Sequence, residues 1–575
     1  MNENFPTEQL ALMEISDEYI LSKSSENMES QSLRKQNGFN LDEVWGDSPY
    51  MDSFTSDYQI EQKLQQFVDF GRLDDQYLDI GSQPFQSFND EIMNLVDTAF
   101  QDSEPSESEN KRPRVLRPTS LEILQKYGSR LKSFNHEEKN VRRHETECNK
   151  KGSRTLSTET IIRLAAEEFI QSSSRSSYEL SVLSHPYAGA ILGQVEEDFK
   201  EVKLVLNLLS CAEKVGGEQY ERVRRLLLEC ARMSSRTGNP VERLAFYFIE
   251  ALYEKIDRET GKFTGKTLAD PQEVLKSLKT TQIAFHRLLP LSQITKFAGT
   301  QAIVEHVAEA RKIHIIDLQI QNGIHCTILM QALASRDDHP VEYLKITTVG
   351  TNSTSMIDET GRHLTSFAQS LNLKFTFNVV MVDDILDLNE KLFDLDEDET
   401  IAVYADYVLN YWIARPDCLD KLMRLIRTLN PCVMVVSEVE ANCNSPFFVE
   451  RFVDTLFFYG AFFDSMADCL KNDEENRRAA ESTCFGSAIR NIVAAEGDER
   501  KIRHVSIDVW RAYFGRFGLI EVELSMSSLY QANLILKNFV CGDSCAFNMN
   551  NKSLIIGWKG TPLSSLSAWK FENRC

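Results

Sequence analysis

Short runs rich in β-branched residues alternate with helical stretches from residue 313 onward, and no other feature constrains the fold as strongly. Such alternation is typical of a mainly parallel sheet with helices on both faces. Strands are expected near 313–318, 344–349, 374–380, 400–405 and 432–438, with later strands near 519–525 and 554–558. Helices are expected at 327–334, 360–370, 385–392 and 418–428. The predicted fold class is therefore α/β, with residues 313–575 as its core.

Amphipathic helical patterns precede this core and extend over residues 158–312. Gly238-Asn239-Pro240 interrupts them, and Pro240 is suited to the first turn of the next helix. The leucines of this region keep no strict heptad over several turns, which favours ordinary core packing over a dimer zipper. We expect an α-helical cap beside the sheet.

The N-terminal 157 residues differ sharply in charge from the rest of the chain. Residues 1–110 hold 24 Asp and Glu against 5 Lys and Arg, which predicts a disordered acidic tail. Aromatic and aliphatic residues interleaved with the acid are typical of transcriptional activation segments. Residues 111–157 form a basic linker, and its cluster Lys111, Arg112, Arg114 and Arg117 is a candidate nuclear-import signal.

The charge also limits the partners of the folded region. The chain carries a net charge of -23, and the part after the basic linker is itself mildly acidic. Such a body does not attract a phosphate backbone through its general field, so DNA contact must be local or made through a partner. No zinc-finger or basic-zipper motif is found, and no apolar run of about 18 residues predicts a membrane span.

One segment has the pattern of a nucleotide-type pocket: an apolar strand that ends at Asp317, a loop with Gly323, and a helix. Cofactor loops usually contain two or three glycines, and the next strand ends at Gly350 without an acidic residue for a ribose. We therefore expect Asp317 to cap the following helix or to pair with a neighbouring loop. His314 is expected to be a hydrogen-bonded core histidine, and His325 has no obvious carboxylate partner in the sequence. A methyltransferase that uses S-adenosylmethionine, or a small-ligand sensor at Asp317, remains the alternative.

Five blocks of residues, in order, resemble the GRAS family of plant transcription regulators. The block that resembles VHIID consists of Ile313, His314, Ile315, Ile316 and Asp317. The block that resembles PFYRE includes Pro446, Phe447, Phe448, Arg451 and Glu481. The block that resembles SAW includes Trp510, Trp558, Ser567, Ala568 and Trp569. Segments that begin at Leu208 and at Gly361 resemble the two leucine-rich regions of the family.

The resemblance implies a Rossmann-like fold, akin to methyltransferases, with an α-helical cap and usually without enzyme activity. No cofactor or metal is expected. It further implies a nuclear regulator or co-regulator of plant genes that binds DNA-binding transcription factors. Other GRAS proteins are expected partners, in homo- or heterodimers, and direct contact with DNA is left open. His325 and Cys326 depart from the family pattern, and the tail lacks the degron of the DELLA branch, so the branch is not resolved.

Two structural expectations follow from these blocks. Arg451 and Glu481 are expected to form a buried or interfacial ion pair that fixes the C-terminal region. The tryptophans Trp510, Trp558 and Trp569 are expected to fill the space between sheet and helices.

Overall fold

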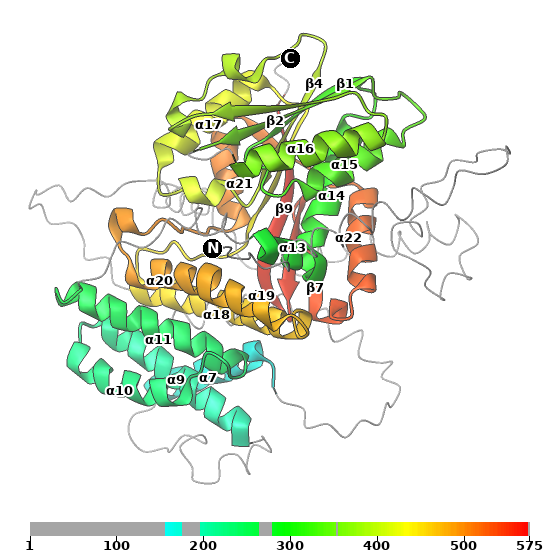
Figure 1. The fold of residues 1–575 in the computed structure, drawn as a ribbon. Coiled ribbons are helices and arrows are strands. Elements are labelled where there is room, and N and C mark those ends of the chain that lie inside the picture. The colour runs from blue at the N-terminus through cyan, green and yellow to red at the C-terminus, as the bar shows by residue number, and fades with distance from the viewer. Residues whose placement is uncertain (1–155, 175–195, 264–278, 352–354, 573–575) are drawn as a thin grey trace, which may run out of the picture. The chain divides into compact units, whose positions relative to one another are not determined.

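The computed structural model describes residues 156–174, 196–263, 279–351 and 355–572 (Figure 1). The predicted acidic tail and the import cluster at Lys111, Arg112, Arg114 and Arg117 lie outside these residues. Within the described part of the chain, no helix is both long and apolar enough to cross a membrane.

Nine strands of the described residues form one sheet, in the order β3-β2-β1-β4-β5-β9-β8-β7, with β6 also paired to β9. The strands are β1 (Lys312–Asp317), β2 (Tyr343–Gly350), β3 (Phe375–Met381), β4 (Thr400–Asp406), β5 (Val433–Val439), β6 (Leu519–Val522), β7 (Cys545–Asn550), β8 (Ser553–Trp558) and β9 (Thr561–Phe571). Strands β1 to β5 pair in parallel, so the predicted α/β sheet is confirmed with all five early strands.

The other half of the sheet is antiparallel, which the prediction of a mainly parallel sheet did not anticipate. Strand β9 was not predicted, because Pro562 and three serines give it a weak strand pattern. In the structure these serines are buried beside β5. Ser564 and Ser565 donate hydrogen bonds to the Glu438 carbonyl, and Ser567 donates to that of Val436. Hydrogen bonding thus compensates for burying these hydroxyls.

The helix predicted at 385–392 is wrong: the segment forms two 3₁₀ turns, Ile385–Asp387 and Glu390–Phe393. The side chains of Asp384 and Asn389 accept hydrogen bonds from the backbone amides two residues later. Such local side-chain bonds compete with helix formation and divide the segment into short turns.

Helices cover both faces of the sheet. On one face lie α14 (Pro290–His306), α15 (Ile324–Ala334), α16 (Ser355–Ser370) and α22 (Met526–Asn538), with α13 (Lys279–Leu288) packed against α14. On the other face lie α17 (Pro416–Leu429) and α21 (Ile507–Arg516), which share a second hydrophobic core with the two 3₁₀ turns (Figure 1).

A helical layer packs beside the sheet through α18, which contacts β8 and β9. It contains α7 (Thr158–Ser174), α9 (Glu196–Gly216), α10 (Tyr220–Met233), α11 (Pro240–Glu259), α18 (Phe448–Cys469), α19 (Glu474–Ala479) and α20 (Gly486–Ala494). Pro240 opens α11 as predicted, and Asn239 and Glu242 form a reciprocal capping box there. The layer thus combines helices from 158–259 with helices that follow β5 in the sequence.

Candidate functional site

The candidate site lies where the strand order reverses, at the carboxyl ends of β1 and β4. Open α/β sheets bind ligands at such a point, because the loops that follow the strands diverge there. Strand β1 ends at Asp317, and the chain enters α15 through Gly323, whose φ is +67°. A Cβ atom at Gly323 would come within 2.7 Å of Thr360 on α16, so both conformation and space require glycine.

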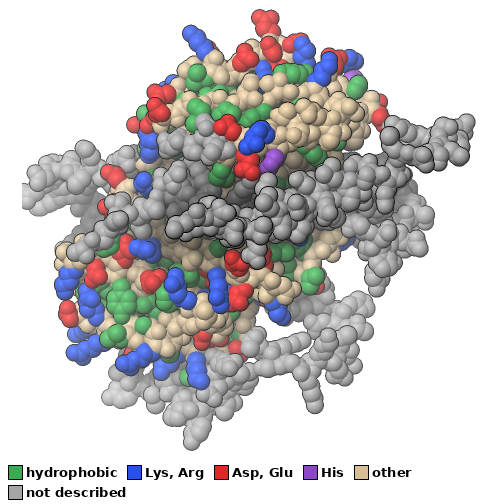
Figure 2. Space-filling view, in the orientation of Figure 1, with side chains coloured by type: hydrophobic (Ala, Val, Ile, Leu, Met, Phe, Trp, Pro, Cys, Tyr) green, Lys and Arg blue, Asp and Glu red, His purple; other side chains and the backbone are tan. Residues whose placement is uncertain are grey.

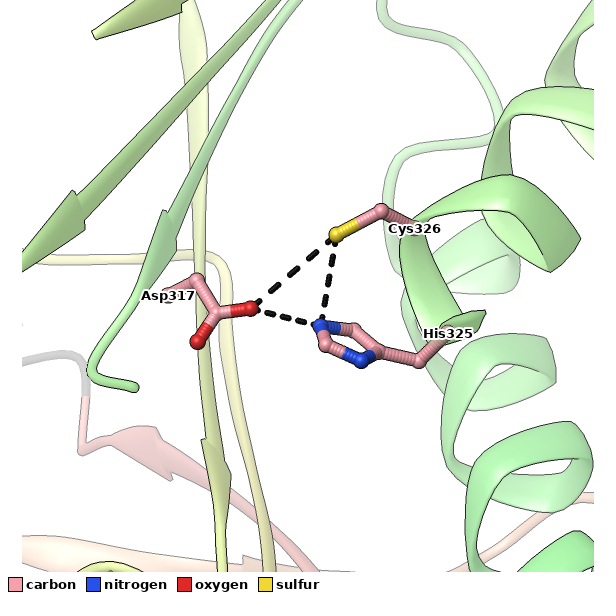
Figure 3. Close-up of side chains that lie close together, drawn as sticks. All are labelled: Asp317, His325 and Cys326. Atoms are coloured by element: carbon pink, nitrogen blue, oxygen red, sulfur yellow. Dashed lines mark hydrogen bonds and ion pairs between the residues drawn. The ribbon is translucent and has the colours of Figure 1, made fainter. Parts of the chain in front are cut away.

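Asp317, His325 and Cys326 form a buried hydrogen-bonded triad at this point (Figure 3). The His325 Nε2 atom lies 2.5 Å from Asp317 Oδ2, and the Cys326 sulfur lies 3.3 Å from the same nitrogen. The other carboxylate oxygen of Asp317 accepts a hydrogen bond from the Gln319 amide. Asp317 therefore pairs with the following loop and with a side chain in the first turn of α15. Pairing with a neighbouring loop was one of the two roles expected for this residue.

The ring of Tyr404 on β4 stacks on His325, with centroids 4.4 Å apart. Burial alone would lower the pKa of His325, but the adjacent Cys326 and Asp317 raise it to about 10. Burial raises the pKa of the Cys326 thiol, and the nearby imidazole offsets part of that effect. The Asp317 carboxylate thus favours a protonated imidazole, and burial favours the neutral form of the thiol. This combination supplies neither a free base nor a thiolate nucleophile at neutral pH.

The triad also has three residue types that can bind metal ions. A structural zinc site usually needs four ligands, and the described residues bring only these three donor atoms together. The Asp317–His325 distance is that of a direct hydrogen bond, so the same atoms already satisfy each other. The arrangement fits a packing motif better than a metal centre.

A second polar group closes the site from the side of α14. Lys296 donates to Asp406 at the end of β4 over 3.0 Å, and both side chains are buried. Tyr407 contacts Ser564 on β9 through a short hydroxyl–hydroxyl hydrogen bond. The Tyr404 hydroxyl and the second carboxylate oxygen of Asp406 are buried and have no hydrogen-bond partner among the described residues.

The remaining residues of the VHIID block lie within β1. Ile313 and Ile315 belong to the core shared with the helical layer, whereas Ile316 faces α17 and α21. His314 is buried and contacts Glu399 and Thr347, each at 2.7 Å. Burial lowers the pKa of His314, although Glu399 opposes that effect. His314 is thus a hydrogen-bonded core histidine, as expected.

The predicted Arg451–Glu481 ion pair is wrong, although both side chains are buried. Arg451 pairs with Glu496 at 2.5 Å and donates to the carbonyls of Ile492 and Ser445. Glu481 instead pairs with Arg243 of α11 and Arg477 of α19. A long arginine side chain reaches several acceptors, so membership in one sequence block did not identify its partner.

The PFYRE and SAW residues lie where helices meet the sheet. Pro446 precedes α18, Phe447 occupies its N-cap position without a side-chain hydrogen bond, and Phe448 begins the helix. Trp510, Trp558 and Trp569 are all buried. Trp558 donates to Asp464 of α18, whereas Trp569 donates to Ser567 and meets Phe514 edge-on. Ala568 is buried on β9 opposite Val435 of β5.

Sequence reasoning missed the carboxylate partner of His325. The signal was present: Asp317 ends a strand, and His325 lies in the first turn of the helix eight residues later. In a strand–loop–helix unit these two positions meet at the same end of the sheet. Arg243 was missed as the partner of Glu481, since 238 residues separate the two.

The chain is similar to known proteins over about two thirds of its length. The model of the GRAS domain family matches residues 204–570. DELLA protein GAI1 of Vitis vinifera is 29% identical over 65% of this chain and 62% of its own length. DELLA protein 2 of Medicago truncatula is 30% identical, over 65% of this chain and 69% of its own length. The structure of SCL7 from Oryza sativa is 27% identical with a TM-score of 0.56, and the match covers 64% of this chain and 99% of that one.

Proposed function

The chain belongs to the GRAS domain family, and from this premise we propose that it regulates plant transcription by binding DNA-bound transcription factors. The match spans 62% of the length of the first relative, so the activity of the whole protein is part of the proposal. In this reading the folded region holds partner proteins and catalyses no reaction.

The closed triad at the end of β1 is the observation that most supports a non-catalytic role. Asp317 and His325 satisfy each other where an enzyme of this fold would receive its cofactor, and Tyr404 covers the imidazole. Calorimetric titration with S-adenosylmethionine tests this part of the proposal. We expect no heat of binding, and a stoichiometric signal would contradict it.

Partner capture tests the central claim. The tagged full-length chain is purified from plant nuclei, and co-purifying proteins are identified with and without nuclease treatment. We expect DNA-binding transcription factors to remain after DNA is digested, together with other GRAS proteins if dimers form. Recovery that depends entirely on intact DNA would instead indicate direct contact with DNA and contradict the proposed protein–protein route.

Nuclear entry is proposed to use Lys111, Arg112, Arg114 and Arg117. The test replaces Lys111, Arg112 and Arg114 with alanine in a fluorescently tagged full-length chain, and we expect the nuclear share of fluorescence to fall. A control with Lys139, Arg142 and Arg143 replaced by alanine removes the same charge from the same linker. An equal nuclear share of fluorescence in the two variants would rule out this cluster as the nuclear-import signal.

Residues 1–110 are proposed to be an activation segment. Fusion of this segment to an unrelated DNA-binding domain is expected to raise reporter output. Unchanged reporter output would show that the segment does not activate transcription and is only a solvating tail.

A further inference from the structure

The acidic–leucine loop, defined as residues 383–399 between β3 and β4, combines charge and exposed apolar surface. It contains nine Asp and Glu residues, and Lys391 is its only basic residue. Its inner side chains, Ile385, Leu388 and Phe393, are buried against the sheet and α17. Its outer leucines are exposed: 44% for Leu386, 42% for Leu392 and 40% for Leu395. Figure 2 shows hydrophobic side chains interspersed with acidic and basic ones over the end of the molecule that carries α17.

The loop is fixed to the core at both ends. Asp384 pairs with Arg415 at the start of α17 over 2.6 Å. Near the other end, Glu399 is buried between His314 and Lys345, and Asp398 pairs with Lys312. The outer leucines are therefore held in place on an ordered support. The inner residues already supply the packing, so the folded core does not require apolar side chains on the outer side.

Apart from Asp394, whose backbone carbonyl accepts a hydrogen bond from Lys345, four outer carboxylates are exposed and make no ion pair with any residue that the structure describes. They are Asp383, Asp387, Glu390 and Glu397. Four unpaired negative charges along a short, anchored loop create a local field that attracts cations and repels phosphate backbones. The charge therefore excludes nucleic acid as an occupant and favours a positively charged protein segment.

We propose that the acidic–leucine loop is a docking surface for a basic segment of a partner protein, with apolar side chains spaced between its Lys and Arg residues. This rests on the proposed function and names the chemistry of the partner. The carboxylates speed the association of the basic segment and disfavour negatively charged partners. Contact between the segment's apolar side chains and the three leucines slows its dissociation. Neither component alone distinguishes this partner from others.

Fluorescence anisotropy of the full-length chain tests the surface. The probe is a labelled peptide of about 18 residues, or five helical turns, with leucine at helical spacing and Lys or Arg elsewhere. Two loop variants are compared with the wild type: D383N/D387N/E390Q/E397Q, and L386S/L392S/L395S. We expect each to raise Kd about tenfold or more, the first through slower association and the second through faster dissociation.

A matched control separates the loop from the general acidity of the protein. The variant E309Q/D338N/E475Q/E523Q neutralises four exposed carboxylates outside the loop that make no ion pair with described residues, so its net charge equals that of the first loop variant. We expect its Kd to stay within about twofold of wild type. Equal weakening in the control and the loop variant, or unchanged binding in the leucine variant, would overturn the proposal.

The basic linker of the same chain is the competing occupant. In the full-length chain, Lys139, Arg142, Arg143, Lys150, Lys151 and Arg154 are replaced by glutamine. We expect unchanged peptide affinity. Tighter peptide binding would show that the linker covers the loop and would overturn the partner assignment.

Two outcomes separate this proposal from the proposed function. If the loop variants bind the peptide as tightly as wild type does, and capture transcription factors equally well, the surface proposal fails while the proposed function stands. If none is captured by the wild type, the proposed function fails whatever the peptide result.

Discussion

The carboxyl end of β1 and the acidic–leucine loop both contain carboxylates, but they place them in opposite surroundings. At the end of β1, Asp317 is buried and directly paired with His325. In the loop, Asp387 and Glu390 are exposed and unpaired with any described residue. A buried carboxylate without a partner is costly, whereas an exposed one loses little solvation. The difference separates a buried carboxylate that serves the fold from exposed loop carboxylates that are available to a partner.

Replacing Asp317 with alanine tests the buried side of this comparison and has the largest expected effect. The change leaves the His325 imidazole buried without its counter-charge, and removing one partner of such a pair costs about 3–5 kcal/mol of unfolding free energy. Urea denaturation measures the loss. Asp338→Ala serves as the control, because this carboxylate is exposed, and it is expected to change little. A loss below about 1 kcal/mol for Asp317→Ala would contradict a stabilising triad.

The pH dependence of stability distinguishes an ionic triad from a neutral one. The pKa of His325 is raised to about 10 in the folded state, so its contribution is complete below about 6.5 and is lost as pH rises toward 10. We expect the stability advantage of wild type over His325→Gln to shrink across this window, by up to about 1.4 kcal/mol per pH unit. Denaturation of both proteins at several pH values measures it.

Glu438, which is buried, and Glu440, which is half-buried, also lower the stability as pH rises, so their effect must be separated from that of His325. Burial raises the pKa of Glu438 to about 7 and that of Glu440 to about 8, so both also reduce stability as pH rises. Both are present in wild type and variant, and the difference between the two proteins removes their contribution. A difference that stays constant from pH 6 to 10 would mean that His325 is not charged in the folded protein.

The early sheet could be predicted from the sequence because its signals are local. Strand β1 carries three isoleucines among its six residues and is buried on both faces, and β-branched residues at this density favour a strand. Strand β9 carries serines whose burial depends on the carbonyls of Val436 and Glu438 more than 120 residues earlier. Nothing within β9 itself shows that these acceptors will be available, so local propensity could not identify it.

The polar partners show the same distinction. His325 and Asp317 are eight residues apart within one strand–loop–helix unit, so their pairing could have been found from the topology. Arg451 pairs with Glu496, and Glu481 pairs with Arg243. These pairs depend on how separate segments pack together, and no local sequence pattern specifies that packing. In the sequence, the acidic–leucine loop shows only its negative charge. Which of its apolar side chains are buried and which are exposed follows from the two 3₁₀ turns that replace the predicted helix.

Replacing Tyr404 with phenylalanine sharpens the comparison within the buried site. Its hydroxyl has no hydrogen-bond partner in the part of the chain that the structure describes, whereas its ring stacks on His325. Phenylalanine keeps the ring and removes an unsatisfied polar atom, so we expect a change within about 1 kcal/mol, toward higher stability. Tyr513→Phe is the control, because its hydroxyl donates to Asp420 over 2.7 Å, and it is expected to lose about 1 kcal/mol. A larger loss for Tyr404→Phe than for Tyr513→Phe would show that the Tyr404 hydroxyl is engaged.

Leu392→Ser tests the exposed side of the comparison and has the smallest expected effect on stability, within about 0.5 kcal/mol. Leu388→Ala, four residues earlier in the same loop, is expected to cost about 2–5 kcal/mol, because Leu388 is buried against the sheet. Thermal and urea denaturation of the two variants measure this contrast. If Leu392→Ser destabilises the protein as much as Leu388→Ala, the outer leucines belong to the core and cannot serve a partner. If it leaves stability intact and weakens peptide binding, the leucine contributes to recognition, because its loss then destabilises the complex and not the fold.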